Sequence, residues 1–351
     1  MEKRLWFVDN LRVLLTVLVV LHHIAVTYSG MGLWYYTEEP TSGAVALWLT
    51  VFLLVNQAWF MGAFFLLSGY FTPASYDRKG PRAFLRDRLI RLGIPLLAFY
   101  FMLNPILYVG SHTSYLHSIG SGPLWFVLAL LVFDGSYVAF RHFTGNRRLR
   151  GSGALTYRAV IGFVVALVTY ALRIVAPMGT WVPVIDFPTS TYLPQYVSFF
   201  VLGIVAYRRD WLSTITPRMG RVGLGLAIGA TLVFLPLALV LGADAWVGHG
   251  TLSSLFYALW DSTFAVGLVL ALVTFFRRRF NTQGSLGRYL SRHAFTVYVI
   301  HAFVVIAAAR ALSVLEVPTL AKFVIAAVVV LPVCFLLAGP VRRLPGVRAV
   351  L

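Results

Sequence analysis

Three ionisable side chains in the first apolar stretch have the types and spacing needed for proton transfer. His23 lies eleven residues after Arg12, and at 100° per residue the two point in directions about 20° apart around the helix. Asp9, fourteen residues before His23, points in a direction about 40° from that of His23. A neutral imidazole can take a proton from a hydroxyl. Asp9 and Arg12 are spaced to pair on one helix face. The pattern predicts His23 as a general base about 16 Å deeper in the helix than Arg12.

His22 is the competing base, because it adjoins His23 in the chain. It points about 80° away from Arg12, so the spacing favours His23. Ionisable groups inside an apolar span are costly and are therefore functional candidates. The alternative interpretation is structural: a histidine hydrogen-bonded between helices, together with an ordinary interfacial ion pair.

Two later apolar stretches also contain ionisable residues. His301 has a second role at the site or packs as a hydrogen-bonded histidine. Asp261 is expected to orient a histidine or bind hydroxyl groups of a ligand, or else to pair with Arg173 or Arg310. Asp134 is expected to pair with a basic neighbour. The remaining histidines are scattered and lack metal-ligand spacing, so no metal site is expected.

The elements that carry these residues are predicted to be membrane-spanning helices. The chain has 351 residues, of which 59% are hydrophobic and 12% charged, and its mean hydropathy is +0.82. Such values exclude a soluble or disordered chain, and a single cysteine, Cys334, excludes an intrachain disulfide. Spans of about 20 residues cross the hydrocarbon core. Ten candidates are found: 7–28, 44–71, 93–109, 123–140, 159–176, 193–207, 222–241, 253–276, 294–313 and 319–339.

The basic residues predict the orientation of these spans. Alternate connections, with Arg12, hold 26 of the 29 lysines and arginines, and the other connections hold none. Positive residues stay on the cytoplasmic side, so both termini are predicted to be cytoplasmic. We expect an all-α, polytopic bundle of about ten helices, one domain over 1–351, in the cytoplasmic (inner or plasma) membrane. The same distribution explains the net charge of +17 without a nucleic-acid partner.

Three basic residues fall outside this cytoplasmic set, inside spans near the opposite side. They are Arg173, Arg310 and Lys322. Long basic side chains near a span end can extend to the interface at little cost. The alternative is that one of them, with Arg310 the best candidate, neutralises an anion such as a carboxylate on the substrate.

Five motifs in order resemble those of the acyltransferase-3 family of membrane acyltransferases. The first is Val8-Asp9-Asn10-Leu11-Arg12 followed after ten residues by His23. The others are Phe64-Phe65-Leu66-Leu67-Ser68-Gly69-Tyr70, Arg86-Asp87-Arg88-Leu89-Ile90-Arg91-Leu92, Gly122-Pro123-Leu124-Trp125-Phe126-Val127 and Tyr298-Val299-Ile300-His301. The resemblance covers residue 4 to about 305. The sequence Asp-Asn-Leu-Arg is similar to that of the branch of the family that includes periplasmic-glucan succinyltransferases.

The resemblance implies an O-acyltransferase. It would move an acyl group, acetyl or succinyl, from cytoplasmic acyl-coenzyme A to a hydroxyl of an extracytoplasmic carbohydrate or glycoside. The resemblance implies that His23 is the catalytic base and that Arg12 is the motif arginine. Asp9 is expected to belong to the same catalytic group. Donor-binding candidates are Arg86, Arg88 and Arg91, and substrate-binding candidates are His301, Asp261, Trp125 and Ser68.

Two other functions remain open from the sequence. A transporter or flippase for a polar solute would use membrane-embedded aspartate, histidine and arginine as its pathway, although the two halves show no matching interrupted segments. A non-catalytic sensor would tolerate replacement of His23. The oligomeric state, the acyl group and the acceptor are not determined by the sequence.

Overall fold

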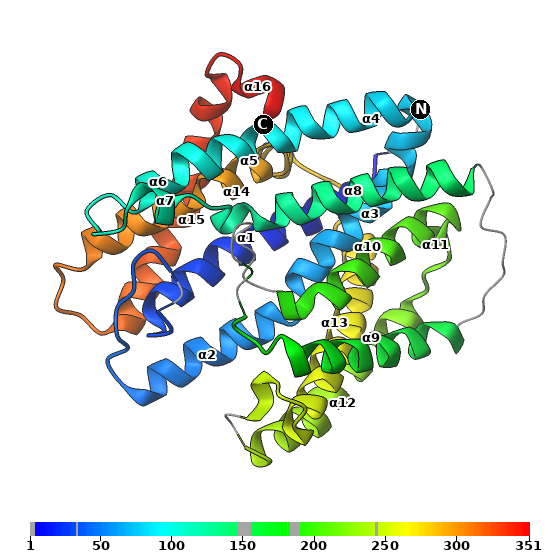
Figure 1. Cartoon of the computed structure of the whole chain (residues 1–351), viewed down its shortest axis with the longest axis horizontal. Helices are drawn as coiled ribbons and strands as arrows, with labels where there is room; N and C mark the ends of the chain where they lie inside the picture. The colour runs from blue at the N-terminus through cyan, green and yellow to red at the C-terminus, as the bar shows by residue number, and fades with distance from the viewer. Residues whose placement is uncertain (1–3, 33, 146–155, 181, 183–189, 243–244) are drawn as a thin grey trace. The chain divides into compact units, whose positions relative to one another are not determined.

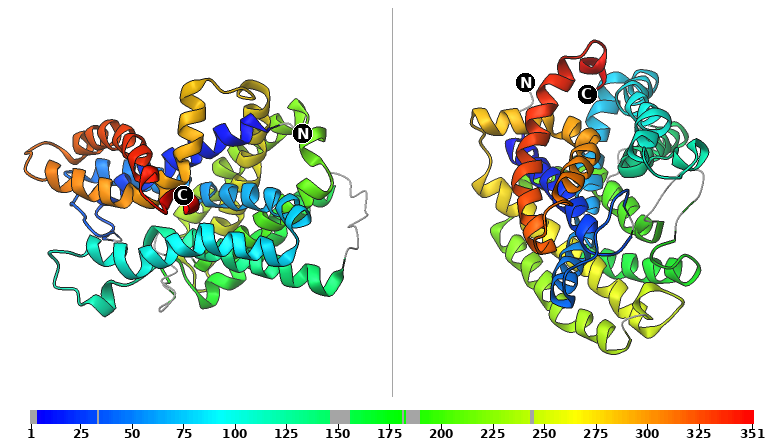
Figure 2. Two further views of the ribbon diagram at one scale, coloured as in Figure 1. Left: turned by 90° about the horizontal axis from the view of Figure 1, so that it is seen from above. Right: turned by 90° about the vertical axis from the view of Figure 1, so that its left-hand side faces the viewer.

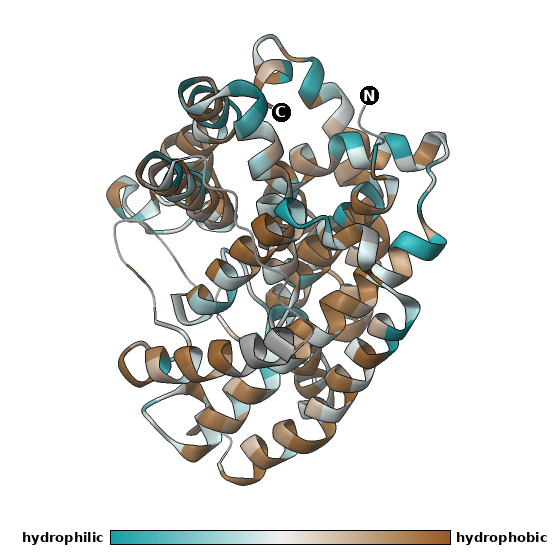
Figure 3. Cartoon of the chain, turned by 90° about the vertical axis from the view of Figure 1, so that its right-hand side faces the viewer, coloured by the Kyte–Doolittle hydropathy of each residue, from teal (hydrophilic) through white to brown (hydrophobic). Residues whose placement is uncertain are grey.

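All regular elements of the described residues are helices, as the sequence predicts. The computed structural model describes residues 4–32, 34–145, 156–180, 182, 190–242 and 245–351, and these contain no β-strand. Hydropathy colouring shows long helices that are mainly apolar along their length (Figure 3). The polytopic helical fold is therefore confirmed.

Eight helical segments in the described part of the chain are long and apolar enough to cross a membrane. They are Trp6–Tyr28, Gly43–Lys79, Pro81–Leu107, Gly122–Thr144, Pro217–Val240, Leu252–Arg279, Ser285–Leu312 and Thr319–Arg343. The other two predicted spans coincide with α9 (Thr156–Val175), whose apolar part is Val164–Val175, and α10 (Leu193–Arg208), which has 16 residues. A helix of 16 residues rises about 24 Å, so α10 is short for a span.

Two predicted spans differ in detail from the observed helices. The predicted span 44–71 is broken at 58–59 into α2 (Gly43–Gln57) and α3 (Phe60–Lys79). The predicted span 93–109 starts earlier, because a continuous helical segment runs over Pro81–Leu107 and includes two π-helical turns. Hydropathy reports the length of an apolar run but not the hydrogen-bond register within it, so neither feature is visible in the sequence.

The chain forms two compact units that alternate along the sequence. The first unit comprises residues 1–57, 90–124 and 280–351. Its elements are α1 (Trp6–Tyr28), α2, α5 (Ile94–Ala98), η2 (Phe99–Leu103), α6 (Asn104–Leu107), α7 (Tyr115–Ser118), η3 (Gly122–Leu124), α14 (Ser285–Leu312), α15 (Thr319–Arg343) and α16 (Val347–Val350). The π-helical turn η1 (Leu89–Gly93) leads into it from the second unit.

In the first unit, α1 packs against α2, α14 and α15, and α14 and α15 lie side by side (Figures 1 and 2). Val20, Ile24, Val297 and Val330 belong to the shared apolar core and are fully buried. The C-terminal part of the chain thus covers the first helix, which carries His23.

The second unit comprises residues 58–89 and 125–279. Its elements are α3, α4 (Pro81–Arg88), α8 (Trp125–Thr144), α9, η4 (Ser190–Tyr192), α10, α11 (Trp211–Thr214), α12 (Pro217–Val240), η5 (Ala245–Val247) and α13 (Leu252–Arg279). The helices α12 and α13 run side by side, as do α3 and α10.

Glycines allow the close packing of α3 against α10. A Cβ on Gly69 of α3 would lie 2.1 Å from the carbonyl oxygen of Phe200, and one on Gly203 of α10 would lie 2.2 Å from that of Leu66. Small residues let the backbones of membrane helices approach this closely. The glycine of the Phe64–Tyr70 motif therefore has a packing role. The expectation of a single domain over 1–351 stays a prediction.

Candidate active site

His23 and His301 form a direct pair within the first unit. The Nε2 atom of His301 lies 3.1 Å from Nδ1 of His23, and the ring centroids are 4.8 Å apart. His301 is fully buried, whereas His23 is partly exposed. His23 is therefore the more exposed member of the pair.

Backbone carbonyls assign the protons of this pair. Nδ1 of His301 lies 2.7 Å from the carbonyl oxygen of Tyr298, so Nδ1 must donate and Nε2 must accept. Nδ1 of His23 lies 2.9 Å from the carbonyl oxygen of Val19 and also faces Nε2 of His301. It must carry a hydrogen as well, since both of these neighbours are acceptors. The lone pair of a neutral His23 therefore resides on Nε2.

The neighbouring His22 has the opposite arrangement. Its Nδ1 lies 3.2 Å from Nδ2 of Asn56, which is an amide donor, so Nδ1 of His22 accepts. A neutral His22 therefore carries its hydrogen on Nε2. Asn56 is 3% exposed and holds its side chain in place with a second contact to the carbonyl oxygen of Leu18.

An aromatic side chain covers His23. The ring of Trp34, from the loop that follows α1, lies 4.2 Å from the His23 ring at an interplanar angle of 33°. Tyr35 contacts Trp34 edge-on and donates a hydrogen bond to Oδ1 of Asn104. The loop is thereby connected to α6.

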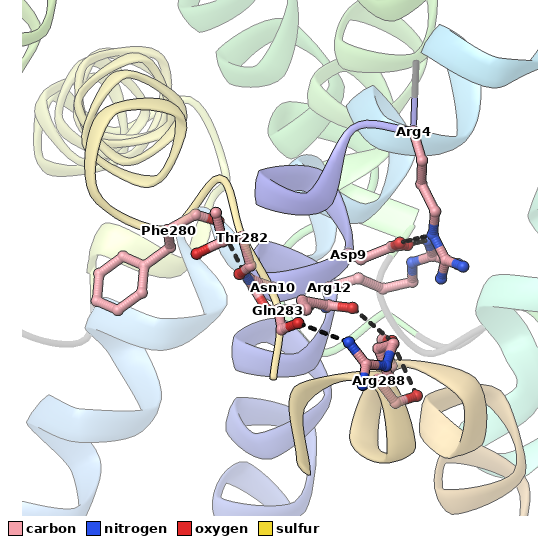
Figure 4. A network of polar contacts seen from close by, with 9 residues as sticks. Arg4, Asp9, Asn10, Arg12, Phe280, Thr282, Gln283 and Arg288 are labelled. Carbon is pink, nitrogen blue, oxygen red and sulfur yellow. Dashed lines mark hydrogen bonds and ion pairs between the residues drawn. The ribbon is translucent and has the colours of Figure 1, made fainter. Parts of the chain in front are cut away.

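The predicted pair of Asp9 and Arg12 is present at the beginning of α1. Arg12 donates to Oδ1 of Asp9, and Nε of Arg4 donates to Oδ2 at 2.8 Å (Figure 4). Asp9 is buried, whereas the side chains of Arg4 and Arg12 are 58% and 44% exposed. One carboxylate thus orients two guanidinium groups that remain accessible to an anion.

Asn10 of the same motif ties α1 to the connection between α13 and α14. Its Nδ2 donates to the carbonyl oxygens of Phe280 and Thr282, and its Oδ1 accepts from Nε2 of Gln283 at 2.8 Å (Figure 4). Arg288 in turn donates to the carbonyl oxygen of Gln283. The motif therefore positions the start of the helix that carries His301.

The three donor-binding candidates differ in their surroundings. Arg86 and Arg91 are exposed. Nε of Arg88 instead forms a 3.0 Å ion pair with Asp134, whose side chain is 1% exposed and also accepts a hydrogen bond from Thr72. Asp134 thus pairs with a basic neighbour, as expected, and Arg88 is held by a buried carboxylate.

The other substrate-binding candidates lie in the second unit. Asp261 pairs with Arg173, and the exposed fractions of the two side chains are 1% and 0%. Trp125 is 8% exposed and stacks on Tyr196 at 5.5 Å. Ser68 is partly buried on α3. Asp261 therefore forms the ion pair with Arg173 that was one of its two predicted alternatives. Trp125 packs against an aromatic neighbour.

Two further basic residues have partners in the first unit. Nζ of Lys322 lies 2.6 Å from Oε2 of Glu38, and Oε1 of the same carboxylate accepts from the hydroxyl of Tyr36 at 3.0 Å. Burial and the hydrogen bond to Glu38 raise the pKa of Tyr36. Arg310 is exposed, and its guanidinium lies 3.5 Å from the carbonyl oxygen of Val109.

Neither Trp34 nor Asn56 was singled out as a site residue from the sequence. Trp34 follows the first apolar stretch, and Asn56 is an amide in an apolar run. An amide inside a predicted span is a signal that could have identified Asn56. No sequence period could indicate Trp34, because its position depends on the path of a loop. Across the described residues, no group of three potential ligands could hold a metal ion.

The described helices and the contact between His23 on α1 and His301 on α14 define a polytopic, membrane-type helical protein with paired histidines. Comparison with known proteins identifies its family. A family model described as an acyltransferase domain matches residues 5–339. The chain belongs to this acyltransferase-3 family, which confirms the resemblance seen in the motifs, and it is a membrane acyltransferase.

Curated relatives agree with this assignment. The chain is 25% identical over 327 residues to glucans biosynthesis protein C of Salmonella schwarzengrund, covering 84% of this chain and 83% of the relative. It is 24% identical over 335 residues to the protein of that name from Escherichia coli O157:H7, covering 85% and 81%.

Proposed function

We propose that the protein transfers an acyl group, acetyl or succinyl, from cytoplasmic acyl-coenzyme A to a hydroxyl of an extracytoplasmic carbohydrate or glycoside, with His23 as the general base. The observation that carries the proposal is the His23–His301 pair, in which Nδ1 of His23 donates and Nε2 holds the lone pair. The printed name of the relatives concerns glucans, which supports a carbohydrate acceptor.

The proposed reaction is a direct transfer. Nε2 of His23 takes the proton of the acceptor hydroxyl as its oxygen attacks the thioester carbonyl carbon. The carbon–sulfur bond then breaks, and the proton passes from His23 to the leaving thiolate. The products are an ester and free coenzyme A. Cys334, the only cysteine, is fully buried, which favours direct transfer over an acyl-cysteine intermediate.

His301 acts on this reaction through His23. When Nε2 takes the proton, the ring becomes a cation whose Nδ1–H still points at Nε2 of His301. A fixed acceptor at that position stabilises the cation and keeps the lone pair on the nitrogen that faces the substrate. The aspartate of serine hydrolases has the same effect on its histidine.

Arg86 and Arg91, which are exposed, are proposed to bind the phosphates of coenzyme A. The ion pair with Asp134 fixes the position of Arg88 beside them in the chain. Arginine suits phosphate because its planar guanidinium donates two parallel hydrogen bonds. Arg12, oriented by Asp9, offers a further accessible guanidinium on α1.

The decisive experiment compares two histidine variants of the purified protein. Acetyl- and succinyl-coenzyme A are supplied with a glucoside acceptor, and ester formation is followed by mass spectrometry. His23→Ala is expected to lower the rate by about 10²- to 10⁴-fold, which is the usual contribution of a general base. His22→Ala should retain most of the activity. An inactive His22→Ala beside an active His23→Ala would refute the assignment.

A further inference from the structure

The indole nitrogen of Trp34 is a buried hydrogen-bond donor without an acceptor. Among the described residues, no group accepts a hydrogen bond from Nε1, although this atom is shielded from solvent. Indole nitrogen can only donate, and a buried tryptophan usually satisfies it. Each unsatisfied buried polar group in a folded protein calls for an explanation. One such explanation is that a bound ligand supplies the acceptor.

This donor lies beside the proposed base. The indole and imidazole centroids are 4.2 Å apart, and the rings are tilted by only 33°. An oxygen of a bound substrate within hydrogen-bond distance of Nε1 would therefore also be close to the reacting atoms at His23. The two histidine neighbours of His23 are at larger angles to its ring, with His22 edge-on at 79° and His301 tilted by 46°.

The Trp34 ring is held in place by its neighbours. Tyr35 packs edge-on against it, at a centroid distance of 4.8 Å, and donates to Asn104. Asn104 is 3% exposed and donates from Nδ2 to the carbonyl oxygen of Ser118 at 2.7 Å. Gly122, at φ +44°, leaves no room for a side chain there, because a Cβ would lie 2.3 Å from the Tyr35 hydroxyl. A donor fixed before the reaction loses no ordering energy during it.

We infer that Nε1–H of Trp34 hydrogen-bonds the thioester carbonyl oxygen and stabilises the negative charge that this oxygen gains when the acceptor attacks. The inference rests on the proposed function and adds to it a catalytic residue from outside the family motifs quoted above. His23 removes the proton, and Trp34 stabilises the oxyanion. When the carbon–sulfur bond breaks, the carbonyl re-forms and the hydrogen bond weakens.

Trp34→Phe tests this role, because phenylalanine retains an aromatic ring but lacks the N–H group. Loss of one oxyanion donor typically lowers kcat by about 10²- to 10³-fold. We expect a decrease in that range with little change in the KM for either substrate. The matched control is Trp48→Phe on α2, whose ring is 74% exposed and which should have wild-type kinetics.

A second variant separates the hydrogen bond from the shape of the ring. Replacing Trp34 with benzothienylalanine, in which sulfur takes the place of N–H, preserves the bicyclic ring and its stacking on His23. It should lose as much kcat as Trp34→Phe. A wild-type kcat in this variant would overturn the inference, even if Trp34→Phe failed to fold.

His23→Ala, measured in parallel, distinguishes failure of this inference from failure of the proposed function. If His23→Ala is inactive and the benzothienylalanine variant is fully active, only the role of Trp34 is wrong. If His23→Ala retains wild-type activity, the proposed base is wrong, and the inference falls with it.

Discussion

His22 and His23 are adjacent residues with different protonation geometry, which is set by what each Nδ1 atom faces. An amide donor from Asn56 faces that of His22, whereas two acceptors face that of His23. The sequence predicted the choice of His23 from its angle to Arg12. It could not predict the contact with His301, which is 278 residues away in the chain. A helical period describes one helix and contains no information about which later helix packs against it.

His301 is expected to behave as a positioning residue. His301→Ala removes the acceptor for Nδ1 of His23 and should lower kcat by about ten- to a hundred-fold, less than loss of the base itself, because the Val19 carbonyl still binds the Nδ1 hydrogen. His301→Gln, whose amide oxygen can accept the same hydrogen bond, should restore part of the rate.

Nitrogen-15 chemical shifts of labelled histidine provide the independent measurement for His301. They should show a neutral His23 protonated on Nδ1 in the wild type and a mixture of tautomers in His301→Ala. An unchanged tautomer with an unchanged rate would contradict the positioning role.

At the scale of elements, the arginines of the Arg86–Leu92 motif are predicted to have two different functions, donor binding by Arg86 and stabilisation of the fold by Arg88. Arg86→Ala should weaken donor affinity by about ten- to a hundred-fold, because a charged hydrogen bond contributes about 1.5–3 kcal/mol. Titration of coenzyme A against each variant measures this. Equal affinities would leave Arg86 without a role in donor binding.

Arg88→Ala is expected to act mainly on stability. It leaves Asp134 buried without its ion-pair partner, a change that costs about 3–5 kcal/mol. The double variant Arg88→Ala/Asp134→Asn should regain much of that loss in a thermal unfolding assay. If the double variant were as unstable as the single one, the ion pair would not be the cause.

The contact between α3 and α10 provides a prediction about packing. Gly69→Ala places a methyl group 2.1 Å from a backbone oxygen, so the two helices must move apart. Overpacking of this kind costs about 1–3 kcal/mol. A lower Tm in detergent is expected. Gly225→Ala on α12, where a Cβ meets nothing within 4 Å, is the control and should leave Tm unchanged or raised. Equal Tm values in both variants would argue against the contact.

The helices themselves were largely predictable, because the length and apolarity of a span are local properties. The start of the third span was not, since the helical segment begins at Pro81, continues through a charged stretch and includes two π-helical turns. The break at 58–59 was also missed, because the two amides before it, Asn56 and Gln57, do not interrupt the apolar average of the whole stretch. These features depend on tertiary packing, which a window average does not contain.

At the scale of the whole molecule, the orientation in the membrane stays a prediction that labelling can test. With Cys334 replaced by alanine, a single cysteine at Ser111 should react with a membrane-impermeant maleimide on intact cells. One at Asn281 should react only after the membrane is opened. Both positions are exposed. The reverse pattern would place the termini outside and would contradict the direction of the proposed transfer.

The alternating order of the two units has a consequence for biosynthesis. The helix that carries His23 is made first, yet α14 and α15, which pack against it, are made after the whole second unit. Until residue 301 has left the ribosome, Nδ1 of His23 faces only the carbonyl oxygen of Val19 on its own helix and lacks its second acceptor, His301. A nascent chain that stops short of α14 thus contains every motif of the family but the last, and its His23 does not yet have the histidine partner of the finished protein.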